Sequence, residues 1–309
     1  MEPFVSIILI HYGAPGSTEE VLHAFEKTRF RDTYEIILVD NGSDPPFPAN
    51  HLRDVHHLRL PVNCGYATAC NRGASIARGT HFLFLNNDIS FSHDFIHPLL
   101  RVCREDSRVG AVGPMLTYAD GMFQPSWGRD PGLLAEYMER RVQQGARKRN
   151  GRAYRARTRS SARAREVDWV TGAAMLVPRP VFEMVGGFDE EFFFYFEDVD
   201  LCRRIRNVGY RVRFEPTACL THFGGGSQGG ETDPALRKAY RAGQLRFYAL
   251  HRGLVSFLLL KLYLLCTLPR ERPHEDQLSA SHSLHDLVLS FPFRTVRKEK
   301  RRCRSPMDS

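Results

Sequence analysis

Three clusters of polar residues each follow a short apolar run, and they hold the side chains best suited to chemistry. The clusters lie at residues 11–13, 40–43 and 86–88. Asp88 closes the last of them, after two asparagines. Because a hard divalent cation prefers carboxylate, water and phosphate oxygens, one or two protein carboxylates suffice when a diphosphate supplies the other ligands. An Asx turn at residues 87–88 would explain Asp88 alone, but three clusters favour a binding site.

A second kind of chemistry is suggested by residues 186–200, where acids are embedded among aromatic side chains. Aromatic neighbours desolvate a carboxylate and raise its pKa, which is how a general base is tuned. A helix that begins near Glu197 would also attract acids through its dipole, but that explains only one or two of them. Farther along, His222 precedes three glycines, which permit close backbone approach to a ligand. A histidine by itself is more often structural.

The hydrophobic pattern supplies a scaffold that would bring these clusters together. Apolar runs typical of buried strands alternate with helical patterns, which predicts an α/β domain with a largely parallel sheet. Ligands bind outside the carboxyl ends of the strands in such sheets. No GxGxxG motif follows the first strand and no GxxxxGK[ST] motif occurs, which weakens the dinucleotide and P-loop interpretations. The predicted strands include 5–10, 36–39, 57–60, 81–85, 109–115 and 210–214, and the predicted helices include 18–25, 66–77 and 94–105.

Composition narrows the class of protein. The chain has 309 residues, 42% of them hydrophobic, enough for one large domain with an appendage. Its seven cysteines form no CxxC pair, which argues against a zinc knuckle and a disulfide framework and favours a reducing compartment. Residues 140–166 hold eleven basic residues and one acid, with few large apolar side chains. They are expected to form a mobile loop, either facing an anionic partner or merely solvated.

Taken in order, the motifs resemble those of family 2 glycosyltransferases, particularly the rhamnosyltransferase-like branch of bacterial polysaccharide synthesis. The resemblance covers about residues 4–228 and implies a GT-A type, Rossmann-like fold with a mixed, mainly parallel sheet. The residue pattern from Pro234 onward predicts a C-terminal helical segment, and a basic tail follows Pro292. The expected division is a domain at 1–228 and a helical extension with a basic tail at 229–309. Within the domain, 1–117 would bind the nucleotide sugar and 167–228 would carry the acceptor and catalytic half. The matching segments are 5–12, 36–43, 63–73, 85–89, 169–177, 186–189, 197–202 and 216–227.

The resemblance also assigns roles to individual residues. Asp198 matches the catalytic base, and Glu197 or Asp200 could hold that role instead. Asp88 and His222 match the metal ligands, although asparagine stands at position 86, where the DxD motif has its first acid. Asp40 matches the residue that contacts the nucleobase. The other donor-binding residues implied by the resemblance are His11, Tyr12, Gly13, Asn63, Gly65, Asn71 and Asn87.

These assignments predict an inverting sugar transfer from a nucleotide-diphosphate donor, with rhamnose as one candidate sugar. The cofactor would be a divalent cation, Mg²⁺ or Mn²⁺. The acceptor would be a hydroxyl of a cell-surface glycan or a lipid-linked glycan, and no nucleic acid is expected as a partner. The alternative is a non-catalytic nucleotide-sugar or carbohydrate-binding protein that keeps the fold. The absence of the first acid of the DxD motif, at position 86, favours this alternative. The intact acid pair at 197–198 and His222 count against it.

The chain is expected in the cytoplasm, in peripheral contact with the inner face of the membrane. The start of the sequence lacks the pattern of a secretory signal. The apolar stretch at 254–268 is shorter than the roughly twenty residues that a spanning helix needs. It is expected either to pack on the domain or to lie in the membrane interface, with Lys261 reaching the headgroups. The basic stretch at 140–166 would add electrostatic attraction to an anionic leaflet.

Overall fold

The computed structural model describes residues 4–49, 52, 54–223, 234–267 and 284–293. Helices and strands alternate through the first half, as the hydrophobic pattern predicts. The elements are β1 (Val5–His11), α1 (Gly16–Lys27), β2 (Tyr34–Asp40), β3 (Val55–Arg59), α2 (Tyr66–Ile76), β4 (His81–Asn86), β5 (Ile89–Ser90), α3 (Ile96–Glu105), β6 (Val109–Thr117), β7 (Phe123–Gln124), β8 (Trp127–Gly128), α4 (Leu133–Arg147), α5 (Arg152–Ser160), β9 (Arg165–Val167), β10 (Trp169–Val170), β11 (Ala174–Pro178), α6 (Arg179–Met184), α7 (Glu197–Asn207), β12 (Arg211–His222), α8 (Pro234–His251), α9 (Leu254–Thr267) and α10 (Leu284–Ser290).

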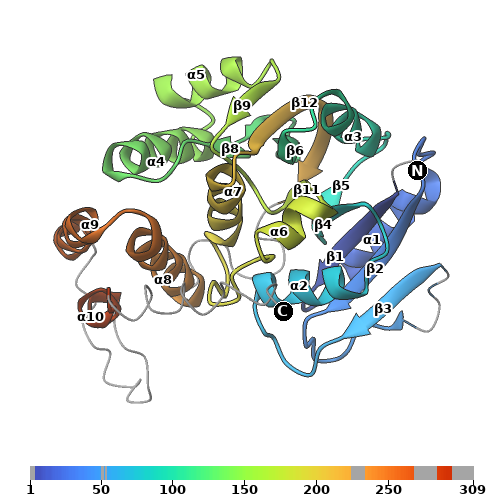
Figure 1. The fold of residues 1–309 in the computed structure, drawn as a ribbon, viewed down its shortest axis with the longest axis horizontal. Coiled ribbons are helices and arrows are strands. Elements are labelled where there is room, and N and C mark those ends of the chain that lie inside the picture. The colour runs from blue at the N-terminus through green and yellow to red at the C-terminus, as the bar shows by residue number, and fades with distance from the viewer. Residues whose placement is uncertain (1–3, 50–51, 53, 224–233, 268–283, 294–309) are drawn as a thin grey trace, which may run out of the picture. The chain divides into compact units, whose positions relative to one another are not determined.

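The central sheet is mixed and mainly parallel, which confirms the predicted α/β fold class (Figure 1). Within the described residues the strand order is β3-β2-β1-β4-β11-β6-β12-β5, with β7 beside β6 and β9 beside β12. The strands β3, β2, β1 and β4 run parallel to one another, and so do β6 and β12. The strand β11 runs antiparallel between β4 and β6. The carboxyl ends of β1, β2 and β4 therefore share one edge of the sheet.

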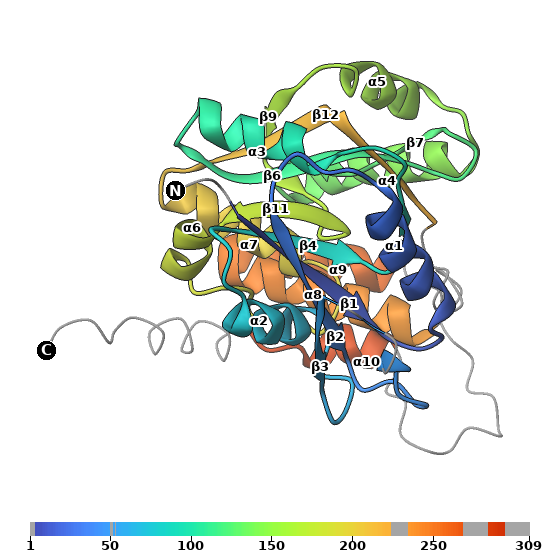
Figure 2. The ribbon, with the colours of Figure 1, turned by 90° about the vertical axis from the view of Figure 1, so that its right-hand side faces the viewer.

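The alternation of side chains along β1 buries both faces of the sheet. Ile7 and Leu9 point into a core that also contains Phe25 of α1 and residues of α3. Ile8 faces the other way, where α2 crosses the sheet at Gly73. A β-carbon at Gly73 would lie 2.5 Å from a methyl group of Ile8, so the glycine allows the close approach of α2. The helices α1 and α2 thus cover opposite faces of the strands (Figure 2).

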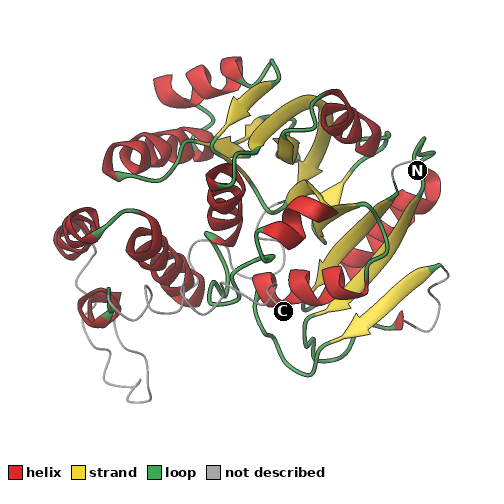
Figure 3. Ribbon diagram, in the orientation of Figure 1, coloured by secondary structure: helices red, strands yellow, loops and turns green. Residues whose placement is uncertain are grey.

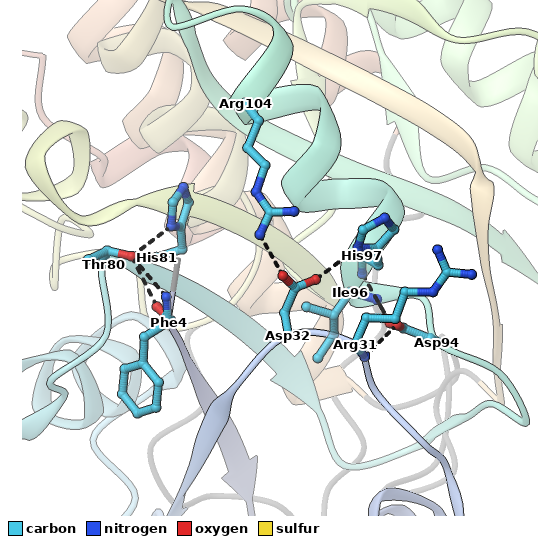
Figure 4. A network of polar contacts seen from close by, with 9 residues as sticks. All are labelled: Phe4, Arg31, Asp32, Thr80, His81, Asp94, Ile96, His97 and Arg104. Carbon is cyan, nitrogen blue, oxygen red and sulfur yellow. Dashed lines mark hydrogen bonds and ion pairs between the residues drawn. The ribbon is translucent and has the colours of Figure 1, made fainter. Parts of the chain in front are cut away.

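Polar contacts hold the amino-terminal ends of the strands together (Figure 4). Asp32, just before β2, accepts hydrogen bonds from Arg104 and His97 of α3. Burial opposes ionisation of Asp32, but these hydrogen bonds outweigh it and its pKa is lowered. Thr80, just before β4, bonds the backbone N–H and carbonyl of Phe4. The protein's own groups thus occupy this end of the strands.

Residues 140–166 do not form the predicted loop: most of them belong to α4, α5 and β9 (Figure 3). Tyr154 is buried and donates its hydroxyl to the Phe123 carbonyl at 2.6 Å. Arg157 pairs with Glu139 at 3.1 Å and its guanidinium lies over the Trp127 ring. The prediction of a loop is wrong because it was based on the small number of large apolar residues. One buried tyrosine, small buried residues and ion pairs of arginine with acids order the segment instead.

The chain divides into two compact units. The first comprises Met1–Phe193 and Glu197–Gly230, and the second comprises Phe194–Phe196 and Glu231–Ser309. In the second unit the described helices α8, α9 and α10 contact one another, as expected for a helical extension. The glycines that follow His222 and the basic tail beyond residue 293 lie outside the described residues. No helix in the described part of the chain is long and apolar enough to cross a membrane.

Candidate active site

The register of the parallel strands brings the predicted polar clusters to one edge. His11 at the end of β1 lies opposite Asp40 at the end of β2, and Ile10 lies opposite Asn86 at the end of β4. All three clusters named from the sequence therefore start at neighbouring positions on the carboxyl edge. This is the edge at which sheets of this type bind ligands.

Asp40 holds the loop that follows β2. Its side chain is fully buried and accepts hydrogen bonds from the backbone N–H groups of Ser43 (2.9 Å) and Phe47 (3.1 Å). Burial opposes ionisation of Asp40, but the hydrogen bonds outweigh it and the pKa is lowered. The structure thus shows a carboxylate that shapes the loop, and its contact with a nucleobase stays a prediction.

Asn41 joins this loop to a second one before α2. Its amide group donates to Asn63 Oδ1 at 3.0 Å, and the same oxygen accepts the backbone N–H of Gly65 at 3.0 Å. A β-carbon at Gly42, whose φ is 75°, would lie 2.2 Å from the carbonyl carbon of Val62, so only glycine lets the loops approach this closely. Two predicted donor-binding residues, Asn63 and Gly65, are thereby fixed beside the end of β2.

A hydroxyl group that the sequence did not single out joins two other predicted residues. Thr18 Oγ1 lies 2.7 Å from His11 Nδ1 and accepts a hydrogen bond from Asn87 Nδ2 at 3.0 Å. Burial lowers the pKa of His11, so its ring is neutral at pH 7. Tyr12 is exposed, and Gly13 has a left-handed φ of 91°. His11 and Asn87 therefore connect β1, α1 and the end of β4.

Asp88 and His222 are 134 positions apart in the sequence, and the strand pairing brings them together. Ile89 in β5 pairs with His222 at the end of β12, and the Phe223 N–H donates to the Asp88 carbonyl at 2.9 Å. Asp88 Oδ1 then lies 3.1 Å from His222 Nε2, with the side chains 9% and 14% exposed. Despite this proximity, Asp88 Oδ1 has no hydrogen-bond partner among the described residues.

A buried carboxylate oxygen and an imidazole nitrogen that approach without a hydrogen bond suit a shared cation. Carboxylate oxygen suits Mg²⁺ and Mn²⁺, and imidazole is a common ligand of divalent metals. The described residues contain no cluster of three or more His, Cys, Asp and Glu side chains that could hold a metal. Asp88 and His222 fit a cation whose remaining ligands come from a bound diphosphate and water.

Asp198 lies in the first turn of α7, beside the chain that leads into β11. Its Oδ2 accepts the backbone N–H of Gly172 at 2.8 Å, and its Oδ1 accepts the N–H of Val199 at 2.8 Å. The Gly172 carbonyl in turn accepts the hydroxyl of Tyr66 at 2.7 Å. Each carboxylate oxygen has a second lone pair. The partly exposed Asp198 can therefore accept a proton without leaving its place.

The three acids proposed as the base have different surroundings. Burial raises the pKa of Asp198, although backbone hydrogen bonds oppose it. Burial and then the nearby Asp198 charge raise the pKa of Glu197 well above its ordinary value, and its side chain is almost fully buried. Asp200 is also buried, and it accepts a hydrogen bond from Arg204 Nε at 2.7 Å in an ion pair. Asp198 alone combines partial exposure with a raised pKa.

Asn71 uses its amide group to hold a turn. Its Oδ1 accepts the Phe188 N–H at 2.9 Å, and its Nδ2 donates to the Phe188 carbonyl at 3.0 Å and to Glu190 Oε1 at 2.9 Å. These bonds tie α2 to the segment that leads toward α7. A role for Asn71 in lining the donor stays a prediction.

Comparison with known proteins defines the class of enzyme. Residues 6–170 match the model of Glycosyl transferase family 2, and the chain belongs to this family of glycosyltransferases. It is similar to the N-acetylglucosaminyl-diphospho-decaprenol L-rhamnosyltransferase of Mycobacterium tuberculosis, with 30% identity over 257 residues, or 77% of this chain and 81% of that protein. A shorter stretch of 57 residues is 42% identical to the rhamnosyltransferase WbbL of Escherichia coli, covering 18% of this chain and 22% of that one.

A solved structure supports the fold. The mannosyltransferase PcManGT of Pyrobaculum calidifontis, in complex with GDP-Man and Mn²⁺, superposes with a TM-score of 0.55 and 18% identity. The match covers 86% of this chain and 71% of that one. The likeness confirms the GT-A type fold expected from the sequence.

The sequence did not reveal the residues that hold the predicted ones in place. Thr18 and Tyr66 lie in the first turns of α1 and α2, Gly172 lies in a turn and Gln124 in a two-residue strand, and hydrophobic periodicity gives no signal of their contacts. The position of Tyr66, next to Gly65 in a matching segment, was the one available hint. The supporting residues are Thr18, Tyr66, Gln124 and Gly172.

Proposed function

We propose that the chain transfers a sugar, with inversion, from a nucleotide-diphosphate donor to a hydroxyl group of a glycan or lipid-linked acceptor. One observation carries the proposal: the Asp88–His222 pair and the Asp198 carboxylate lie near the same end of the sheet, beside the end of β4 and the start of β11. The Asn86 N–H donates to the Ala173 carbonyl at 2.9 Å, and the preceding residue, Gly172, donates to Asp198. The Asp88–His222 pair, which suits a diphosphate-bound cation, and Asp198, which can accept a proton, thus lie on adjacent segments.

Asp198 acts as the general base. Its carboxylate takes the proton of the acceptor hydroxyl as that oxygen forms a bond to the anomeric carbon of the donor sugar. The bond between the anomeric carbon and the diphosphate oxygen breaks in the same displacement, and the nucleoside diphosphate leaves. A single displacement at that carbon gives inversion. The raised pKa of Asp198 makes it a stronger base than an exposed aspartate.

Asp88 and His222 hold a divalent cation, Mg²⁺ or Mn²⁺, which when bound neutralises the charge on the departing diphosphate. The loops held by Asp40 and Asn41 lie at the same edge, and with His11, Tyr12 and Asn87 they form the side proposed to receive the nucleotide. The sugar proposed is rhamnose, since two rhamnosyltransferases are among the relatives.

The test is a panel of nucleotide sugars, including dTDP-rhamnose, UDP-sugars and GDP-mannose, with and without Mn²⁺. Donor hydrolysis is followed first, and transfer to a polyprenyl-diphosphate-linked acceptor second. We expect turnover of one donor that depends on a divalent cation. Binding of a donor without hydrolysis or transfer would favour the non-catalytic alternative, which no relative named above supports.

We also propose peripheral contact with a membrane, because α9 exposes a continuous apolar stripe. Its large exposed residues recur at helical spacing, whereas Phe257, Leu260 and Leu264 on the same helix are buried. Lys261 does not reach outward as the sequence suggested: its ammonium group donates to the carbonyls of Leu289 (2.9 Å) and Phe291 (3.3 Å). An apolar stripe of this size suits the membrane interface. It is formed by Leu254, Val255, Leu258, Leu259 and Leu262.

Helix α4 offers a second surface of the same kind. Leu134, Tyr137 and Met138 are 77%, 54% and 50% exposed, and exposed arginines follow at 140 and 141. Apolar side chains beside basic ones suit an anionic leaflet. This placement replaces the predicted basic loop with a basic helix.

Flotation with vesicles of phosphatidylcholine alone, or with added phosphatidylglycerol, tests the contact. We expect binding that needs the anionic lipid and weakens with salt, since surface charges are screened beyond about 8 Å at physiological salt. Leu258→Glu and Leu134→Glu should each weaken it, whereas Val208→Glu, at an exposed residue of the first unit, should not. Absence of binding to anionic vesicles at low salt would overturn the contact.

A further inference from the structure

Gln124 contacts the side of His222 that faces away from Asp88. It lies in β7, which pairs with β6, and β6 pairs in turn with β12, whose last residue is His222. Gln124 Oε1 lies 2.9 Å from His222 Nδ1. On the opposite side of the ring, His222 Nε2 is 3.1 Å from Asp88 Oδ1. The imidazole is therefore held between an amide oxygen and a carboxylate oxygen.

The amide oxygen determines which ring nitrogen carries the proton. A carboxamide oxygen accepts hydrogen bonds and does not donate them, so the contact requires a hydrogen on His222 Nδ1. A neutral imidazole protonated at Nδ1 has a lone pair at Nε2. Asn86 Nδ2 approaches this nitrogen at 3.5 Å, and Asp88 Oδ1, which has no hydrogen-bond partner in the described part of the chain, lies 3.1 Å from it. The opposite tautomer would place a proton where a metal ion needs a ligand.

We infer that Gln124 is a positioning residue: it fixes the tautomer and orientation of His222 so that Nε2 and Asp88 Oδ1 form the protein's half of the cation site. The inference rests on the proposed function, which assigns the cation to this pair. Hydrogen-bonded partners of a metal-ligating histidine typically change metal affinity 10–100-fold when they are replaced. Gln124 touches neither the donor nor the acceptor in this role, so its effect is on cation binding.

The experiment measures binding of Mn²⁺ alone to the full-length protein, from the loss of the free-ion EPR signal. Gln124→Leu removes the acceptor at similar size and should weaken Mn²⁺ binding about 10–100-fold. Gln124→Glu keeps an oxygen acceptor and should bind Mn²⁺ at least as well as the native protein. Gln143→Leu is the matched control, because Gln143 bonds Glu139 within α4, and it should leave binding unchanged.

Two further measurements separate failure of the inference from failure of the proposed function. His222→Ala should weaken Mn²⁺ binding more than Gln124→Leu does; a native protein that binds Mn²⁺ neither alone nor with UDP or dTDP present, or a His222→Ala protein that binds it normally, overturns the cation site itself. If His222→Ala loses binding while Gln124→Leu binds like the native protein, only the positioning role is overturned. Imidazole ¹⁵N NMR of the native protein needs no Gln124 variant: it should show His222 protonated at Nδ1, and protonation at Nε2 alone overturns the role.

Discussion

Two acids near the amino-terminal ends of the parallel strands, Glu35 and Asp32, have surroundings opposite to those of Asp88 and Asp198 near the carboxyl ends. At the amino-terminal ends, Glu35 accepts hydrogen bonds from Ser6 (2.6 Å) and from the backbone and side chain of Arg78 (2.7–2.9 Å). Burial opposes ionisation of Glu35, but these bonds outweigh it and the pKa is lowered. At the carboxyl ends, Asp88 Oδ1 has no hydrogen bond among the described residues, and burial raises the pKa of Asp198.

The difference separates two uses of the same functional group. An acid surrounded by donors and cations is stabilised as an anion and strengthens the fold. An acid that is buried with no hydrogen bond, as at Asp88 Oδ1, or with backbone N–H donors and no cation, as at Asp198, costs folding free energy because its charge is poorly compensated. Such a group keeps spare capacity to bind a proton or a cation, which is the property that an active site needs. Substitutions at Glu35 and Asp32 should therefore lower stability, whereas substitutions at Asp88 and Asp198 should lower activity.

The largest effect is expected from Asp198→Asn. The amide keeps the shape of the side chain but cannot take the proton of the acceptor hydroxyl. The rate of transfer at saturating substrates should fall on the order of 10²–10⁴-fold, while donor affinity stays near the native value. Single-turnover transfer and calorimetric donor titration measure the two quantities separately. Transfer at near-native rate by folded Asp198→Asn protein would remove Asp198 from the mechanism.

Loss of a cation ligand should have the next largest effect. Asp88→Ala and His222→Ala should each raise the Mn²⁺ concentration needed for half-maximal transfer, and lower kcat/KM about 10²-fold at fixed Mn²⁺, as expected when two to three kcal/mol of charge stabilisation is lost. The native enzyme should be inactive in EDTA and recover with Mg²⁺ or Mn²⁺. Full activity of the native enzyme in EDTA, with both variants as active as the native enzyme, would contradict the assignment of Asp88 and His222 as cation ligands.

Asp32→Asn makes the same chemical change at the opposite end of the strands and should affect stability alone. The hydrogen bonds from Arg104 and His97 lose their charged acceptor, which should lower the free energy of unfolding by about 1–3 kcal/mol at pH 7. Because the pKa of native Asp32 is lowered, its contribution is present above the ordinary aspartate pKa and is lost as the pH falls through the lowered value. Urea unfolding at several pH values should show native and variant stabilities converging in acid, with kcat unchanged at neutral pH.

The sequence predicted the parts of the site that depend on strand order. The apolar runs that end at Asp40 and Asn86 located the carboxyl edge, because a parallel sheet places such ends side by side. Gln124 could not be found in this way, since it lies in a two-residue strand after the periodic pattern ends. The helices at 133–160 were missed for a different reason: Tyr154 and the partners of Arg157 are long-range contacts, which local composition does not report.

The smallest effect is expected from Glu197→Gln, although Glu197 is adjacent to the proposed base. Burial and the nearby Asp198 charge raise the pKa of Glu197 well above its ordinary value, and burial also raises the pKa of Asp198. Two backbone N–H groups stabilise the ionised form of Asp198, whereas Glu197 Oε2 has no hydrogen-bond partner among the described residues. Asp198 is therefore expected to ionise first as the pH rises, while Glu197 is still protonated. Glutamine resembles protonated glutamate in shape and charge, so kcat should stay within a few-fold of native.

The native rate should fall as the pH drops through the raised pKa of Asp198, above the ordinary aspartate range, and Glu197→Gln should keep this acid limb in place. A raised carboxyl pKa contributes stability that is lost as the pH rises through it, so the variant should also resist urea better than the native protein at alkaline pH. A 10²-fold loss of kcat in Glu197→Gln, with Asp198→Asn nearly silent, would transfer the role of base to Glu197.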